Sequence, residues 1–304
     1  MDRDVVLNAK VIEAVWNEDG GIWNVKVEIN NTVQEDWCHV LVNGSGFLNA
    51  WSWPSIAGLH DFAGHICHSA DWRDDYDFSG KRVAIVGNGS SAVQIVPQLQ
   101  PVATHLANYV RSPTWISAPF AEDLSKEPGA NPCYTEEEKE RFRKYPEELH
   151  AYRKSLAHAF NHFYEALIEG SPANLEARKR TKKMMEERLN GRPDLASKLI
   201  PDWSLGCRRL TPGNGYLEAL TKDNAEVITG DIDKITPTGI QTANGDHREY
   251  DAIVCATGFD VSFKPRWLQV GRHGRVLADE WSEDAKSYFS LCVSGYPNHF
   301  LFNG

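Results

Sequence analysis

A glycine-rich turn carries the clearest chemical signal in the sequence. The segment KRVAIVGNGSSAVQIVPQL places Gly87 and Gly89 between a β-branched apolar run and a stretch with helical apolar spacing. Glycines in such a turn let the backbone approach a pyrophosphate closely, and the helix that follows offers free N–H groups and a positive dipole. The GxGxxA pattern therefore predicts a dinucleotide-binding site made of Gly87, Asn88, Gly89, Ser90, Ser91 and Ala92.

The next predicted strand, HLANYVRSPTW, ends in Arg111 and Ser112. An acidic residue at this place would accept hydrogen bonds from a ribose 2′-hydroxyl, as NADH requires. A guanidinium and a hydroxyl suit a 2′-phosphate instead, because arginine forms charge-assisted hydrogen bonds to phosphate. We therefore expect NADPH to be preferred over NADH, the alternative being that Arg111 is an ordinary surface arginine.

Two further segments place small residues where a ligand could approach. EYDAIVCATGFD reads as a buried strand that ends in Thr257 and Gly258, and open α/β sheets bind ligands at the carboxyl ends of their strands. HVLVNGSGFLN reads as a buried strand running into a glycine turn at Gly44 and Gly46, for which a tight turn is the simpler interpretation.

Several elements must position these residues. VWNEDGGIWNVKVEIN predicts a β-hairpin with a DGG turn, and a short helix near 216–220 and strands around Val227 and Ile240 follow later. Between about 122 and 199 the sequence becomes charged and helical. There His158 and His162 have metal-ligand spacing, but no HExxH motif accompanies them and no metal site is predicted. The middle helix is expected to bury a face made of Leu149, Tyr152, Leu156, Phe160, Phe163 and Leu167.

The composition is that of an ordinary globular protein. Of 304 residues, 41% are apolar and 24% charged, and the net charge of −10 argues against binding to nucleic acid or anionic lipid. The six cysteines show no CxxC pair, so neither a disulfide framework nor a zinc site is expected. No apolar run is long enough to span a bilayer and no signal peptide is evident, so a cytoplasmic location is expected.

The segment FAGHICHSADW fits neither an amphipathic helix nor an alternating strand. It resembles the FxGxxxHxxxW fingerprint of Baeyer-Villiger monooxygenases, a family of class B flavoprotein monooxygenases, with Phe62, Gly64, His68 and Trp72 in register. GNGSSA, RSP, GCRRLTPG and CATGFD follow in the family's order. The sequence departs from the family at Arg73, where Pro or Asp is usual.

The resemblance implies an α/β fold with a Rossmann-like NADP-binding domain, a helical insertion and partial FAD-domain segments, an incomplete form of the architecture with two dinucleotide-binding domains. The expected division is 1–61 for a β-rich part of the FAD-binding domain, 62–80 for an interdomain linker with the fingerprint, 81–118 and 201–260 for the NADP-binding domain, 119–200 for the helical insertion, and 261–304 for the return to the FAD-binding domain.

The resemblance also assigns roles to residues. Arg209 matches the arginine that stabilises negative charge on the flavin during its reaction with oxygen, and Arg208 matches the basic residue near the NADP 2′-phosphate. In the family the fingerprint, here including His68 and Trp72, couples nicotinamide movement to flavin chemistry. The alternative for His68 is a buried side chain hydrogen-bonded to backbone. Gly46 and Thr257 would contact the periphery of FAD.

The implied function is NADPH-dependent insertion of one oxygen atom from O2 into a small hydrophobic ketone, of the kind found in secondary metabolism. Family members begin with a GxGxxG for FAD, which is not found before Gly87, and continue beyond PNHFLFNG. We therefore expect a sequence incomplete at both ends, with weak or absent FAD binding. The alternatives are a flavin-free binding module or redox-neutral cyclase or isomerase acting on a hydrophobic metabolite, and an N- or S-oxidising relative.

Overall fold

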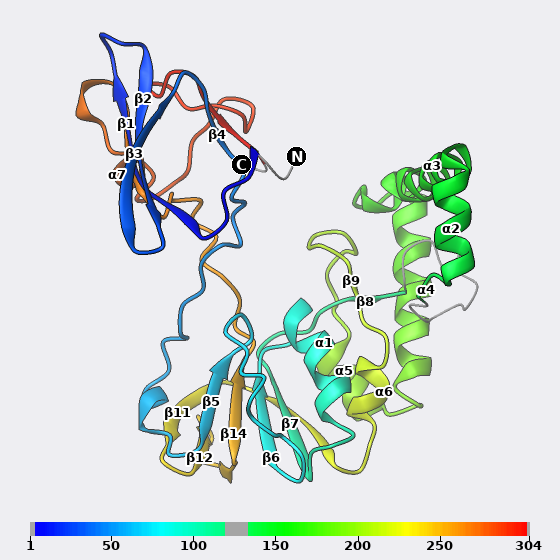
Figure 1. The fold of residues 1–304 in the computed structure, drawn as a ribbon. Coiled ribbons are helices and arrows are strands. Elements are labelled where there is room, and N and C mark those ends of the chain that lie inside the picture. The colour runs from blue at the N-terminus through cyan, green and yellow to red at the C-terminus, as the bar shows by residue number, and fades with distance from the viewer. Residues whose placement is uncertain (1–3, 119–132, 303–304) are drawn as a thin grey trace. The chain divides into compact units, whose positions relative to one another are not determined.

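A computed structural model of the chain describes residues 4–118 and 133–302. The chain divides into two compact units, one made of Met1–Ser52 with Phe259–Gly304 and the other of Trp53–Gly258 (Figure 1). We call them unit 1 and unit 2. Residues 119–132, the first part of the expected helical insertion, lie outside the described residues. No helix in the described parts is both long and apolar enough to cross a membrane.

Unit 2 is built on a parallel sheet with the strand order β10-β7-β6-β14-β5. Its strands are β5 (His65–His68), β6 (Arg82–Val86), β7 (His105–Val110), β10 (Ala225–Thr229) and β14 (Ala252–Cys255). The predicted buried strand at β14 is confirmed, and the β-branched run before the glycine turn forms the strand β6. Both are apolar along nearly their whole length because parallel sheets are covered on both faces. The α/β fold class expected from the sequence is confirmed.

The two faces of this sheet belong to separate apolar cores. Val83 and Ile85 of β6 pack with α1 (Ser90–Leu99), α5 (Pro193–Leu199) and α6 (Tyr216–Leu220). Ala84 and Val86 face the opposite core, which includes residues of an antiparallel sheet of β11 (Ile232–Thr236), β12 (Gly239–Thr242) and β13 (His247–Glu249). This division follows from the alternation of side chains along a strand. The predicted helix at 216–220 and the strands around Val227 and Ile240 are confirmed.

A short parallel pair of strands joins two distant parts of unit 2. In it β8 (Ile116–Ser117) pairs with β9 (Thr211–Pro212), with Ile116 opposite Thr211. Because the pair is parallel, the segments that precede the two strands, 111–115 and 206–210, approach from the same end. This pairing therefore brings the RSP segment and the CRR segment toward one side of the unit.

The described residues between β8 and β9 are largely helical. They contain α2 (Glu136–Lys144), α3 (Pro146–His162), the 3-10 turn η4 (Tyr164–Leu167) and α4 (Pro172–Arg188), and then α5. The helix α2 begins at Thr135 in a capping box with Glu138, as the TEEE sequence favours.

The expectation that α3 buries one whole face is wrong. Leu149, Tyr152 and Leu156 are half-buried, whereas Phe160 is 53% exposed. Phe163 and Leu167 are exposed as well. Among the described residues α3 packs on the short helix α2, where Tyr152 stacks on Phe142 at 5.8 Å between ring centroids. One short helix covers only part of the apolar stripe, so helical spacing overstates its burial.

Unit 1 contains a four-stranded sheet in the order β15-β1-β2-β3. Its strands are β1 (Ala9–Asn17), β2 (Ile22–Ile29), β3 (Thr32–Cys38) and β15 (Leu268–Val270). The predicted hairpin is confirmed, since β1 and β2 are antiparallel and Asn17 pairs with Ile22 across the turn. The buried Trp23 packs in a core with Leu277 of α7 (Leu277–Glu280) and with Trp281.

A parallel pair of short strands completes unit 1. It consists of β4 (Leu41–Asn43) and β16 (His299–Leu301). The expectation that β4 is a buried strand is wrong, because Val42 is 52% exposed and its neighbours are half-buried. Among the described residues β4 pairs with β16 alone, in a two-stranded sheet. Both faces of a parallel strand are buried only where other elements pack on both sides of a larger sheet.

The chain leaves and re-enters unit 1 at neighbouring points. Trp51 and Phe259 form an antiparallel β-bridge, and the Asp260 N–H donates a 2.9 Å hydrogen bond to the Ala50 carbonyl. Residues 53–258 are therefore inserted between two paired segments of unit 1. Further 3-10 turns in the described parts of the chain include η2 (Leu59–Asp61) in unit 2 and η5 (Arg272–Gly274) in unit 1.

Candidate dinucleotide site

The two glycines of the turn after β6 serve different purposes. Gly87 has a φ of +110°, and a Cβ atom there would lie 2.4 Å from the carbonyl oxygen of Ala256, just beyond β14. No side chain fits this approach, so Gly87 is required by the fold. Gly89 is the N-cap of α1, and a Cβ atom there would meet nothing within 4 Å. The helix N-terminus is thus open to an approaching phosphate.

Asn108 on β7 supports the glycine turn from below. It is fully buried, and its Nδ2 atom donates hydrogen bonds to the carbonyls of Ile85 at 3.1 Å and Gly87 at 2.7 Å. Asn88, in the turn itself, donates a 2.8 Å hydrogen bond to the Ser112 carbonyl. Asn108 is not among the residues predicted from the sequence, although a single amide within the apolar run HLANYV is a signal, because buried polar groups need partners.

Thr257 and Gly258 lie at the same edge of the sheet as the glycine turn. They follow β14, which is the direct neighbour of β6, and the Ala256 N–H donates a 2.9 Å hydrogen bond to the Val86 carbonyl. Thr257 is exposed and Gly258 has a φ of +92°. The structure therefore brings the GNGSSA and CATG segments together at the carboxyl ends of adjacent parallel strands.

The predicted arginines are exposed near the same edge. Arg111 directly follows β7, and Arg208 and Arg209 precede β9, whose pairing with β8 directs both segments to one end. The Arg208 guanidinium carbon lies 5.4 Å from the centroid of the Trp203 ring, a cation–π contact. These guanidinium groups give the edge a positive charge that suits the phosphates of a dinucleotide.

The fingerprint segment belongs to unit 2, where β5 is the edge strand of the sheet. Phe62 is buried, and a Cβ atom on Gly64 would lie 2.7 Å from the Phe62 ring and 2.6 Å from the Asp251 carbonyl oxygen. Packing therefore explains the spacing of Phe62 and Gly64: the phenyl ring occupies the space that a side chain at position 64 would need. Trp72 is 36% exposed and stacks on Phe78 at 5.3 Å between centroids.

His68 ends β5 and is fully buried. Its Nδ1 atom accepts a 3.1 Å hydrogen bond from the Ala70 N–H, and its ring lies edge-on to Trp53 at 6.2 Å. Burial lowers the pKa of His68, while hydrogen bonding with the Gly258 backbone and the charge of Asp71 act in the opposite direction. This is the environment of a neutral histidine bonded to backbone, and a chemical role for it stays a prediction.

Unit 1 offers less to a cofactor. Gly46, with a φ of +70°, lies in the turn after β4, beside a small hollow. The hollow is lined by Asn43, Ser45, Gly46, Phe47, Asn49, Phe263, Lys264, Pro265 and Arg266. Within residues 4–52 and 259–302 the one α-helix is α7, which follows Val276 rather than a glycine-rich turn. These described residues fit contacts to the edge of a flavin cofactor but not the anchoring of its pyrophosphate.

Metal binding finds no support in the described residues. They contain no group of three or more His, Cys, Asp and Glu side chains that could hold a metal ion. The cysteines of the chain are free thiols in the structure.

A parallel sheet whose glycine turn opens onto a helix N-terminus, with exposed guanidinium groups at the same edge, is the arrangement found in α/β proteins that bind dinucleotides. Residues 8–124 match the family model described as flavin-binding monooxygenase-like. Similar proteins include the FAD-binding monooxygenase tazF of Aspergillus terreus, 45% identical over 99% of this chain and 54% of its own length. A Baeyer-Villiger monooxygenase of Pseudomonas aeruginosa is 33% identical over 100% of this chain and 55% of its own length.

Solved structures with a similar fold also include monooxygenases. Cyclohexanone monooxygenase from Rhodococcus sp. Phi1 bound to NADP+ is 25% identical, with a TM-score of 0.77 over 97% of this chain and 60% of that one. OTEMO in complex with FAD and NADP is 27% identical, with a TM-score of 0.78 over 97% of this chain and 61% of that one. The chain is thus similar to FAD-binding monooxygenases, Baeyer-Villiger monooxygenases among them, and the resemblance inferred from the sequence is confirmed. It spans about half the length of the curated relatives it matches.

Proposed function

We propose that the chain acts in NADPH-dependent oxygenation of the Baeyer-Villiger type, in which one atom of O2 is inserted into a hydrophobic ketone to give an ester or lactone. The observation that carries the proposal is the open N-terminus of α1 behind Gly89, at the sheet edge where Thr257 and Gly258 also lie. The similarity to FAD-binding and Baeyer-Villiger monooxygenases supports the reaction class.

Several of the predicted residues bind NADPH in this proposal. The amides from Gly89 to Ala92 receive the pyrophosphate, while Arg111, Ser112 and Arg208 receive the 2′-phosphate. NADPH, when bound, supplies hydride. Arg209 contributes a guanidinium that stays charged at neutral pH, so it stabilises negative charge without giving up a proton.

FAD, when bound, supplies the oxygen chemistry, and Gly46 contacts its edge. His68 and Trp72 belong to the segment that couples nicotinamide position to that chemistry. The substrate class, a small hydrophobic ketone together with O2, and a cytoplasmic location are parts of the same proposal.

Cofactor choice is the part of the proposal that this chain tests most directly. Replacing Arg111 with alanine should weaken NADPH binding by roughly 1 to 3 kcal/mol, the scale of a charge-assisted hydrogen bond, because the 2′-phosphate loses a partner. NADH, which has no 2′-phosphate, should bind almost unchanged. Titration calorimetry with both cofactors measures the two dissociation constants.

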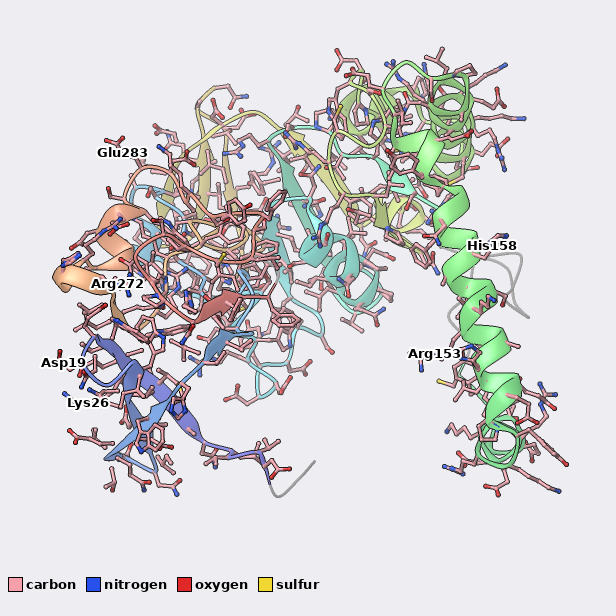
Figure 2. The ribbon with its side chains drawn as sticks, turned by 90° about the horizontal axis from the view of Figure 1, so that it is seen from above. Asp19, Lys26, Arg153, His158, Arg272 and Glu283 are labelled. Atoms are coloured by element: carbon pink, nitrogen blue, oxygen red, sulfur yellow. The ribbon has the colours of Figure 1, made fainter. Side chains whose placement is uncertain are left out.

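A matched control for Arg111 is Arg153, another exposed arginine, which projects from α3 (Figure 2). Arg153→Ala should leave both affinities unchanged. If Arg111→Ala weakened NADH as much as NADPH, the 2′-phosphate assignment would be wrong.

The reaction itself is tested on the native protein purified from the organism that produces it. Flavin absorbance, ketone-dependent NADPH consumption and one atom of oxygen-18 from labelled O2 in the product would support the proposal. A colourless protein that converts its metabolite without NADPH would instead favour the redox-neutral alternative. Incorporation of oxygen at nitrogen or sulfur would point to the heteroatom-oxidising alternative.

A further inference from the structure

The loop that carries Arg208 and Arg209 is fastened to the helical region through one buried amide. Asn174, in the first turn of α4, is 1% exposed. Its Nδ2 atom donates hydrogen bonds to the carbonyls of Ala166 at 2.7 Å and Leu205 at 2.8 Å. Its Oδ1 atom accepts a 2.9 Å hydrogen bond from the Ser204 hydroxyl. The amide thus connects α4, the turn before it and the arginine loop.

The arginine loop, residues 203–210, is shaped by further contacts. The Cys207 N–H donates to the Ser204 carbonyl at 3.3 Å, which closes one turn. The Trp203 carbonyl accepts a 3.1 Å hydrogen bond from the Trp115 indole. Gly206 has a φ of +94°, and a Cβ atom on it would lie 3.2 Å from the Leu167 side chain. The chain therefore turns tightly against η4 just before the arginines.

The hydrogen bonds from Asn174 hold the part of the loop that lies directly before the arginines. They hold Ser204 and Leu205, between Trp203, whose ring lies under the Arg208 guanidinium, and Arg208 itself. An asparagine side chain supplies two donors and an acceptor at once. Leucine of similar size supplies neither, and aspartate cannot donate to the two carbonyls.

We propose that Asn174 is a positioning residue for cofactor recognition: it fixes the Ser204–Leu205 backbone and so holds the Arg208 guanidinium where the 2′-phosphate of NADPH binds. The proposal rests on the proposed function, in which Arg208 meets that phosphate. It gives the helical region a role in this chain, since α4 would fix the position of a cofactor-binding residue. A guanidinium that is already held in its bound position loses less conformational freedom when NADPH binds, so the affinity for NADPH is higher.

The test compares Asn174→Leu with a matched control, Asn224→Leu. Asn224 has the same bonding pattern, donating to the carbonyls of Gln100 and Ala103 and accepting from the Gln100 amide. It lies just before β10, at the amino ends of the strands and away from the site. Both variants should be less stable. Only Asn174→Leu should raise the NADPH dissociation constant, about tenfold, with NADH unchanged.

Amide hydrogen exchange provides a readout that needs no cofactor. In Asn174→Leu the loop 203–210 should exchange faster than in the native chain, and in Asn224→Leu it should not. Ser204→Ala removes one of the bonds and serves if Asn174→Leu fails to fold. It should shift both the NADPH affinity and the loop exchange in the same direction by a smaller factor.

The outcomes separate the two proposals. A folded Asn174→Leu variant with native NADPH affinity and native loop exchange would overturn the role of Asn174. Equal weakening of NADPH and NADH would also overturn it, because a merely structural role affects both. If the native chain itself showed no preference for NADPH, the proposed function would fail, while the exchange data would still report how the loop is held.

Discussion

The hydroxyl of Tyr216 on α6 donates a 2.8 Å hydrogen bond to the Oδ1 atom of Asn108 on β7. Both side chains are almost completely buried, at 1% and 0% exposure. Asn108 in turn donates to the carbonyl of Gly87, so the tyrosine supports the glycine turn through one intermediate. A helix that follows the arginine loop thereby stabilises the turn that is proposed to receive the pyrophosphate.

Replacing Tyr216 with phenylalanine should lower the free energy of unfolding by about 1 to 3 kcal/mol, because the Asn108 oxygen is then buried without a partner. Urea unfolding measures the change. Tyr109→Phe is a useful comparison, since the Tyr109 hydroxyl bonds to that of Tyr250 on the other face of the sheet. It should not affect NADPH affinity, whereas Tyr216→Phe should lower it. Equal NADPH affinity in the two variants would contradict the support of the turn by Tyr216.

Alanine substitution of the two glycines of the turn should affect different properties, stability at Gly87 and NADPH affinity at Gly89. Gly87→Ala introduces a side chain at positive φ against the Ala256 carbonyl and should cost at least about 2 kcal/mol of stability. Gly89→Ala places its methyl group in open space and should cost only about 0.5 to 1 kcal/mol of stability, because alanine is a poorer N-cap than glycine. It should nevertheless weaken NADPH about tenfold or more, because the methyl group obstructs the pyrophosphate. Thermal unfolding and NADPH titration of both variants check this, and full NADPH affinity in Gly89→Ala would place the phosphates elsewhere.

His299 in unit 1 should make stability depend on pH. It is 1% exposed, neither ring nitrogen has a hydrogen-bond partner among the described residues, and burial lowers its pKa to about 4. The unfolded chain takes up this proton near pH 6.5 and the folded chain only near pH 4, so the free energy of unfolding falls as the pH falls through this window.

Between pH 7 and pH 4.5 the native chain should therefore lose about 2 kcal/mol more stability than a His299→Leu variant. Urea unfolding at the two pH values measures the difference. His39→Gln, at an exposed histidine, should keep the native pH dependence. An unchanged pH dependence in His299→Leu would show that His299 is not the responsible group.

Local patterns were sufficient to predict the elements whose cause is local. The turn Gly87–Ala92 lies between β6 and α1 as predicted, because its glycines and the apolar runs on both sides specify it without help from distant residues. The hairpin of β1 and β2 is a similar case. Burial could not be predicted in the same way: the stripe on α3 has helical spacing, but what covers it depends on which element packs there.

The contacts that complete the candidate site depend on residues far apart in sequence. Nothing near Asn174 indicates that its amide meets Leu205, and two residues of β8 give no sign that they pair with β9. The role of Asn108 could have been predicted from the sequence, since an amide in a buried strand needs hydrogen-bond partners that the strand itself cannot supply. Its partner Tyr216 could not be inferred without the fold.

The bridge between Trp51 and Phe259 makes the chain modular. Because the excursion of residues 53–258 starts and finishes at adjacent points, a short peptide could join the two ends left behind, and the excised segment could be transplanted as a cassette. A dinucleotide-binding module could therefore be exchanged between related sequences at Ser52 and Phe259 without rebuilding the sheet of β1, β2, β3 and β15.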